Sequence, residues 1–199
     1  MKQFIRVVMG HVSPSAAVIL ILLTSCATRP LSESRAQSRT CALRERLLDL
    51  NSGVDPDEAA RLAETAVRHS AALARDYRAV RPAWLHNFLV NRGWRDRGLC
   101  YDWANDLFVR LHELGLVSLE IHLAVARMDT RHEHNALIVT ANGQPLLEGE
   151  VLDAWRHSGR LWFGSASTDK YPWRTLPPER LAPELRSLVQ APCHGARAP

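Results

Sequence analysis

Three residues in the second half of the chain have the types and the order of a nucleophile with its base. Cys100 stands where a glycine turn meets a strongly patterned helix, and His134 and Asp153 follow on later strands. A thiol at a helix start meets unpaired backbone N–H groups and the positive end of the helix dipole, and both favour the thiolate, which is the nucleophile. The order Cys, His, Asp is that of a cysteine triad.

Hydrophobic periodicity predicts the elements that would position these residues. A repeat of 3.6 residues predicts helices early in the chain, and an alternation of period two predicts strands after Gly115. Asp55 is expected to cap the longest N-terminal helix, with Glu58 completing a capping box. Asn142-Gly143 predicts a type I′ hairpin turn, so that His134 and Asp153 lie on joined strands.

The predicted helices cover 42–50, 56 to the Pro82 break, 83–90, 101–114 and 179–189, and the predicted strands cover 117–125, 134–141 and 146–153. The segment 155–173 is expected to form loops and an aromatic flap.

A nucleophilic cysteine helix followed by antiparallel strands that carry His and then Asp resembles the transglutaminase-like branch of the papain-like cysteine protease superfamily. The matching motifs are Gly98-Leu99-Cys100-Tyr101-Asp102, His134-Asn135-Ala136 and Leu152-Asp153-Ala154-Trp155. The resemblance spans residues 97–155 and implies an α+β fold in which N-terminal helices and the nucleophile helix pack on an antiparallel β-sheet. It implies a cysteine hydrolase or acyltransferase that acts on amide bonds, with Cys100 as nucleophile, His134 as general base and acid, and Asp153 orienting the imidazole. No cofactor is expected.

The sequence departs from that family at two points. Leu137 stands where many members have an aromatic residue, and no upstream side chain is clearly assigned to an oxyanion hole. The backbone N–H of Cys100 is the safest oxyanion donor, with Asn87 and Trp94 as further candidates. A peptidoglycan endopeptidase of the NlpC/P60 type is the alternative enzyme, although its cysteine is usually followed by Ser-Gly, where this chain has Tyr101-Asp102.

Several alternatives need no cysteine chemistry. His122, His132 and His134 are spaced as a possible zinc site, although His132 lies in a polar loop and no metal is expected. Cys100 as a buried structural thiol, His134 as a strand end bonded to backbone, and Asp153 as a turn former would leave a catalytically silent lipoprotein that binds or assembles with partners.

The N-terminus predicts export and lipidation. A basic start and an apolar run of about a dozen residues, too short to span a bilayer, end in Leu23-Thr24-Ser25-Cys26, which resembles a bacterial lipobox. We therefore expect residues 1–25 to be a signal peptide, Cys26 to be acylated, 26–40 to be a flexible tether, and 41–199 to be one domain. Ala27 is not acidic, which favours the outer membrane, facing the periplasm, if the cell has one.

The remaining composition restricts the partners. The formal net charge is +4, and loss of Lys2 and Arg6 with the signal peptide leaves +2. No basic run is interleaved with aromatic residues, so nucleic-acid binding is not expected. The expected substrates are peptides, proteins or cell-wall stem peptides. Cys41 and Cys193 flank the domain and are expected to form a disulfide in an oxidising compartment, which would leave Cys100 free.

Overall fold

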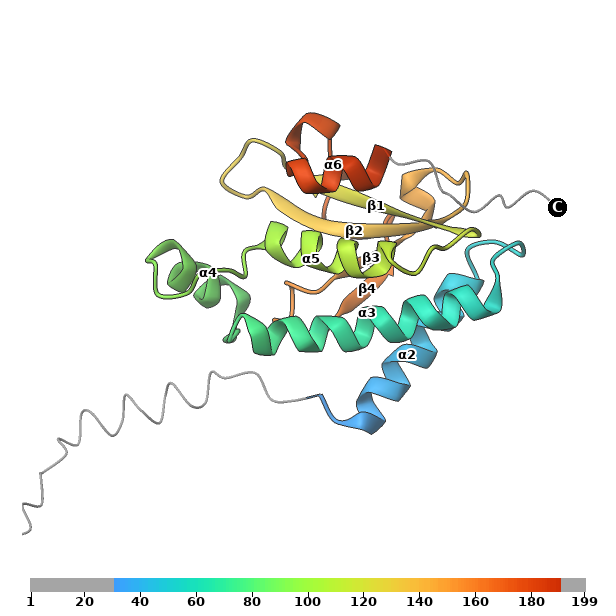
Figure 1. Ribbon diagram of the computed structural model, residues 1–199, viewed down its shortest axis with the longest axis horizontal. Coiled ribbons are helices and arrows are strands. Elements are labelled where there is room, and N and C mark those ends of the chain that lie inside the picture. The colour runs from blue at the N-terminus through green and yellow to red at the C-terminus, as the bar shows by residue number, and fades with distance from the viewer. Residues whose placement is uncertain (1–30, 191–199) are drawn as a thin grey trace, which may run out of the picture.

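An antiparallel sheet with the strand order β4-β3-β2-β1-β5 is the centre of the fold (Figure 1). The structure is a computed structural model and describes residues 31–190. Strands β1 and β2 lie where the periodicity predicts them, whereas β4 lies in the segment expected to be loop and β5 begins at the last residue of that segment. These edge strands are too short to show an alternating pattern. The strands are β1 (Leu119–Ala126), β2 (His134–Ala141), β3 (Glu150–Asp153), β4 (Trp162–Ser165) and β5 (Trp173–Thr175).

Three helices pack together on one face of the sheet. Helix α5 (Cys100–His112) packs on β2 and β1, α3 (Pro56–Asp76) packs on α5, and α2 (Glu33–Leu48) packs on α3. The main core fills these layers, and a smaller apolar cluster covers the opposite face of the sheet. The α+β class and the packing of the cysteine helix on an antiparallel sheet are therefore confirmed. The remaining elements are α4 (Ala83–Asn91), α6 (Pro183–Gln190) and the 3₁₀ turns η1 (Leu146–Glu148) and η2 (Pro178–Arg180).

The predicted tether extends too far into the folded part of the chain. Helix α2 begins at Glu33, eight residues before the predicted domain start at Cys41, so residues 33–40 are helical. The polar composition of this segment concealed a narrow apolar stripe that continues through Leu43 and Leu47, and Ala36 is its first buried member. The helix is also tied to α3, because Arg68 donates to the carboxylate of Glu33.

The connection between β2 and β3 is not the predicted two-residue hairpin. Only Gly143 has a positive φ (77°) in this turn, whereas type I′ needs a positive φ at Asn142 as well. The chain then makes the turn η1 before β3 starts at Glu150, so the third strand is shorter than the predicted 146–153. The apolar pair Leu146-Leu147 has a strand-like composition, but it follows Pro145, which begins the 3₁₀ turn.

The start of α3 links the helical layer to the sheet. Asp55 caps the helix as predicted and accepts from the backbone N–H groups of Asp57 and Glu58. The predicted capping box is wrong, because the buried carboxylate of Glu58 accepts instead from Val117 N–H and from the N–H and hydroxyl of Ser118. Burial opposes ionisation, but these three hydrogen bonds outweigh it and lower the pKa of Glu58. Glu58 therefore fixes where β1 begins.

Several predictions lie outside the described residues. They are the signal peptide, acylation at Cys26 and the Cys41–Cys193 pairing, of which the structure describes only Cys41, on an exposed position of α2. Within residues 31–190, no helix combines the length and the apolar character needed to cross a membrane.

Candidate active site

His134 and Asp153 form a buried pair at one end of the sheet. His134 begins β2 and Asp153 ends β3, and the antiparallel register that pairs Leu137 with Leu152 brings the two ends together. The Nε2 atom of His134 lies 2.7 Å from Oδ2 of Asp153. Both side chains are almost completely buried, at 4% and 1% exposure. The bond leaves Nδ1 as the imidazole nitrogen that can serve another group.

Cys100 lies beside the start of β2. It is the first residue of α5, and its half-buried Sγ atom is 3.9 Å from the carbonyl oxygen of Glu133 and 3.8 Å from Nδ2 of Asn135. Glu133 and Asn135 are the two chain neighbours of His134. The structure therefore brings the three predicted residues together, from one helix start and two neighbouring strand ends.

The protonation of His134 reflects both neighbours. Burial alone would lower the pKa of the imidazole, but hydrogen bonds to Asp153 and Cys100 and their charges outweigh it and raise the pKa of His134 to about 9. The same bond, together with the charge of Arg156, lowers the pKa of Asp153 against the effect of burial. The arrangement favours an imidazolium held between a carboxylate and a sulfur at neutral pH.

Arg156 is a supporting residue that the sequence analysis missed. Its backbone N–H and its Nε both donate to the carboxylate of Asp153, at 2.9 and 3.0 Å. The other end of the guanidinium donates to both oxygens of Asp169. The spacing of three residues between Asp153 and Arg156 could have indicated that they pair. Asp169 lies in a loop, where no sequence pattern identifies it as a partner. Arg156 gives the buried carboxylate a fixed charge partner in addition to the imidazole.

Aromatic side chains enclose the imidazole. The ring centroids of Trp155, Tyr171 and Trp173 lie 4.8, 4.6 and 5.6 Å from that of His134. Trp155 is held in turn by Asn87 of α4, whose Oδ1 accepts from its indole N–H at 2.9 Å. The predicted aromatic flap therefore forms part of the site, and it restricts the orientation of His134.

The turn before Cys100 is held from three directions. The carboxylate of Asp102 accepts from the N–H groups of Gly98 and Leu99. The indole of Trp103 donates to the carbonyl of Gly98 at 2.9 Å, and Nε2 of His86 lies 3.0 Å from the carbonyl oxygen of Arg97. His86 is buried, and burial lowers its pKa. These contacts set the start of α5, and with it the position of the thiol.

Gly98→Ala is expected to displace this turn. Gly98 has φ = 120°, and a Cβ atom there would lie 2.2 Å from Nε2 of His86. Backbone strain and overpacking together should lower the free energy of unfolding by about 3 kcal/mol and slow alkylation of Cys100 severalfold. Gly93→Ala is the matched control, since Gly93 also has a positive φ but open space around it, and should cost about 1 kcal/mol. Urea unfolding and alkylation rates measure both effects, and equal losses in the two variants would contradict the role of the His86 contact.

The other candidate residues are placed elsewhere. Nε2 of His122 contacts Thr140, and His132 is exposed in the loop before β2. Among residues 31–190 no three His, Cys, Asp or Glu side chains gather as a metal site would require, so the zinc alternative lacks its ligand set. Of the two oxyanion candidates, Trp94 packs edge-on against Phe88, and Asn87 accepts the indole N–H of Trp155 through Oδ1, which leaves its Nδ2 group as the donor.

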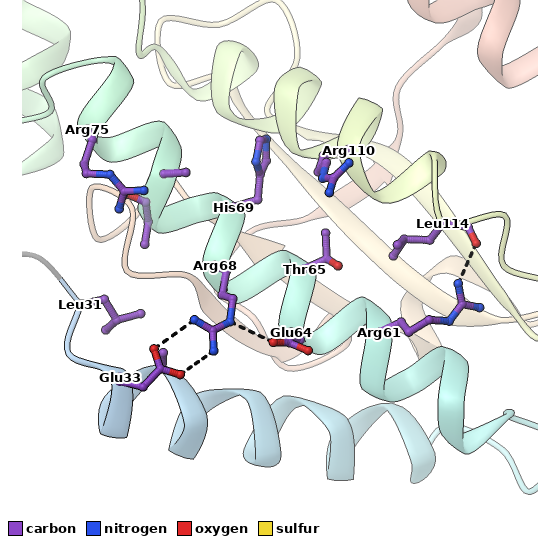
Figure 2. Close-up of a pocket in the computed structure, with 13 residues that line it drawn as sticks. Leu31, Glu33, Arg61, Glu64, Thr65, Arg68, His69, Arg75, Arg110 and Leu114 are labelled. Atoms are coloured by element: carbon purple, nitrogen blue, oxygen red, sulfur yellow. Dashed lines mark hydrogen bonds and ion pairs between the residues drawn. The ribbon is translucent and has the colours of Figure 1, made fainter.

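A groove of about 580 Å³ lies between α2, α3 and α5, apart from this site (Figure 2). Four arginines line it, but Arg68 is already bound by Glu33 and Glu64. None of the three candidate catalytic residues lines the groove. Its lining arginines are Arg61, Arg68, Arg75 and Arg110.

Comparison of the chain with protein-family models, with curated proteins and with solved structures finds no match. The interpretation of the site therefore depends on its own geometry.

Proposed function

We propose that the protein is a papain-like cysteine hydrolase or acyltransferase of the transglutaminase-like type, acting on amide bonds. The observation that carries the proposal is the convergence of three side chains: Nε2 of His134 lies 2.7 Å from Oδ2 of Asp153, and Sγ of Cys100 contacts the backbone carbonyl of Glu133 and the side chain of Asn135, the two chain neighbours of His134. A structural thiol would not need an imidazolium beside it. The buried carboxylate and its Arg156 partner support the same role, because they hold the imidazole in one tautomer and orientation.

The chemistry follows from these positions. The Cys100 thiolate attacks the amide carbonyl carbon, a C–S bond forms, and the negative charge moves to the carbonyl oxygen. The N–H of Cys100, which has no intrahelical acceptor at the helix start, is placed to donate to that oxygen. His134 gives its proton to the leaving nitrogen as the C–N bond breaks, which leaves a thioester. Water or a second amine then attacks the thioester, gives a proton to His134, and releases the thiolate.

We further propose that the chain is anchored to the bacterial envelope through acylated Cys26 and acts on peptides, proteins or cell-wall stem peptides. The support for the anchor is the sequence of residues 1–26, with its basic start, short apolar run and Leu23-Thr24-Ser25-Cys26. The absence of an acidic residue at position 27 favours the outer membrane. Mass spectrometry of the N-terminal peptide would detect the acyl chains directly.

Trapping the thioester tests the enzymatic proposal. Protein extracted from membranes is incubated with peptide and muropeptide pools and a labelled primary amine, then quenched in acid. We expect an acyl adduct on Cys100, together with either label incorporation, which indicates transfer, or a free acid, which indicates hydrolysis. Both signals should disappear in Cys100→Ala and persist in the control Cys41→Ala, because Cys41 is exposed on α2. Turnover that survives in Cys100→Ala, or the absence of adduct and turnover with every pool, would contradict the proposal and favour a silent binding lipoprotein.

A further inference from the structure

Helix α4 is an apolar helix that the rest of the fold leaves largely uncovered. Its sequence is AWLHNFLVN, yet only Ala83 and His86 are buried. Trp84 is 67% exposed, and Phe88, one turn later on the same face, is 44% exposed. The helix projects from the body of the molecule beyond the end of α3 (Figure 1). An apolar helix in this position needs something outside the described fold to cover it.

The loop after α4 extends the same surface. Trp94 is 64% exposed, and its ring meets that of Phe88 edge-on at 6.3 Å. We call Trp84, Phe88 and Trp94 the α4 aromatic surface. Three arginines belong to this segment: the guanidinium of Arg92 lies over the Phe88 ring, that of Arg95 donates to the carbonyl of Trp94, and that of Arg81, before the helix, donates to the carbonyl of His157. None of the ion pairs within residues 31–190 involves these three arginines, so their charges are not neutralised by an acidic side chain there.

The start of the described chain lies beside the C-terminal half of α3, the helix that precedes α4. Leu31 is one of the residues that line the groove between α2, α3 and α5, and so is Arg75, in the last turn of α3 (Figure 2). Cys26, the predicted acylation site, is five residues earlier in the sequence. A fully extended segment of that length spans at most about 18 Å. An acylated Cys26 would therefore hold this end of the domain close to the bilayer, and α4 extends beyond it.

We propose that the α4 aromatic surface docks on the lipid bilayer, with Trp84, Phe88 and Trp94 at the headgroup boundary and Arg81, Arg92 and Arg95 against anionic headgroups. The proposal rests on the proposed anchoring at Cys26. Tryptophan side chains favour the membrane interface because one end of the ring system is apolar and the other donates a hydrogen bond. Arginines beside an apolar helix face add attraction to anionic lipid. The predicted acyl chains and α4 would then fix the orientation of the domain on the membrane.

Quenching of tryptophan fluorescence by lipids brominated on their acyl chains tests the docking. The acylated full-length protein is reconstituted in vesicles of phosphatidylcholine and phosphatidylglycerol. We expect bromolipid to quench the wild type about twofold more strongly than Trp84→Phe/Trp94→Phe, which keeps the aromatic surface but removes its two exposed reporters. Trp84→Glu should reduce the quenching of Trp94 about twofold, because it places a charge in the interface. Val117→Glu is the matched control, since Val117 is 70% exposed just before β1. Bromolipid should quench the fluorescence of this variant as strongly as that of the wild type.

Two results would overturn the docking. In the first, the N-terminal peptide is acylated, but bromolipid quenches the wild type and Trp84→Phe/Trp94→Phe equally. This result would retain the anchor and reject α4 as a membrane contact. In the second, the quenching of Trp94 is unchanged in Trp84→Glu, but this variant turns over a dissolved peptide more slowly in the Cys100-dependent reaction. This result would indicate that the α4 aromatic surface binds substrate rather than lipid. A missing acyl group on Cys26 rejects the anchor itself, and mass spectrometry of the same sample detects it independently of the quenching.

Discussion

His134→Ala should slow alkylation of Cys100 by iodoacetamide at neutral pH by about tenfold. In the wild type the pKa of His134 is raised to about 9, so the imidazole is positively charged at neutral pH and stabilises a neighbouring thiolate. Alanine removes that charge, and an unassisted thiol is only a few per cent ionised at pH 7. The gain in nucleophilicity of a more basic thiolate offsets part of the loss, which limits the expected effect.

Cys41 provides the reference within the same molecule. It is exposed on α2, and in protein reduced beforehand, so that no disulfide to Cys193 blocks it, its alkylation should be the same in both proteins. Mass spectrometry of the two cysteine peptides over time gives both rates from one sample. Equal rates for Cys100 in the wild type and in His134→Ala would show that the imidazole does not activate the sulfur.

Asp153→Asn should lower the free energy of unfolding by about 3–5 kcal/mol, because it leaves the buried Arg156 side chain without one of its charge partners and weakens the bond to His134. Urea unfolding measures this loss. Asp129→Asn is the matched control, since Asp129 pairs with Arg180 on the exposed surface and should cost about 1 kcal/mol or less. A loss at Asp153 no larger than that at Asp129 would contradict a structural role for the buried carboxylate.

The same substitution should change the pH dependence of stability. Because the folded-state pKa of His134 is raised to about 9, its contribution is fully present below the unfolded pKa of about 6.5 and is lost as the pH rises through 9. The wild type should therefore lose roughly 3 kcal/mol over this interval. Asp153→Asn removes the main partner that raises the pKa, so the loss should be smaller and occur at lower pH. Urea unfolding midpoints measured between pH 6.5 and 9 test this expectation. Parallel curves of midpoint against pH for the two proteins would contradict it.

The local pattern of the sequence was sufficient to place the catalytic candidates. Cys100 follows a glycine turn at the start of a periodic helix, and His134 begins a short apolar run, bounded by a turn signal, that is typical of a buried strand. Once the two strands pair antiparallel, the position of Asp153 near His134 follows from the register. These features depend on short-range periodicity, which a single sequence displays directly.

What could not be predicted depends on contacts between distant segments. Arg156 meets Asp169 across thirteen residues of chain without regular spacing, and Glu58 meets Ser118 across sixty. Both side chains have the composition of an exposed surface, and only the tertiary fold shows that they are held against partners. The helical segment 33–40 was missed for a related reason, since its stability comes from packing against α3 rather than from its own residues.

The double role of Arg156 has a consequence for how this chain can vary in evolution. One guanidinium bridges Asp153, which orients the imidazole, and Asp169, which also accepts from the indole of Trp173 in the aromatic wall. If a neutral residue replaces only one of the three, the protein that carries this single substitution has a buried charge without its partner. Descendants should therefore inherit Asp153, Arg156 and Asp169 as a unit or lose them together, and a chain that has abandoned catalysis should have drifted at all three.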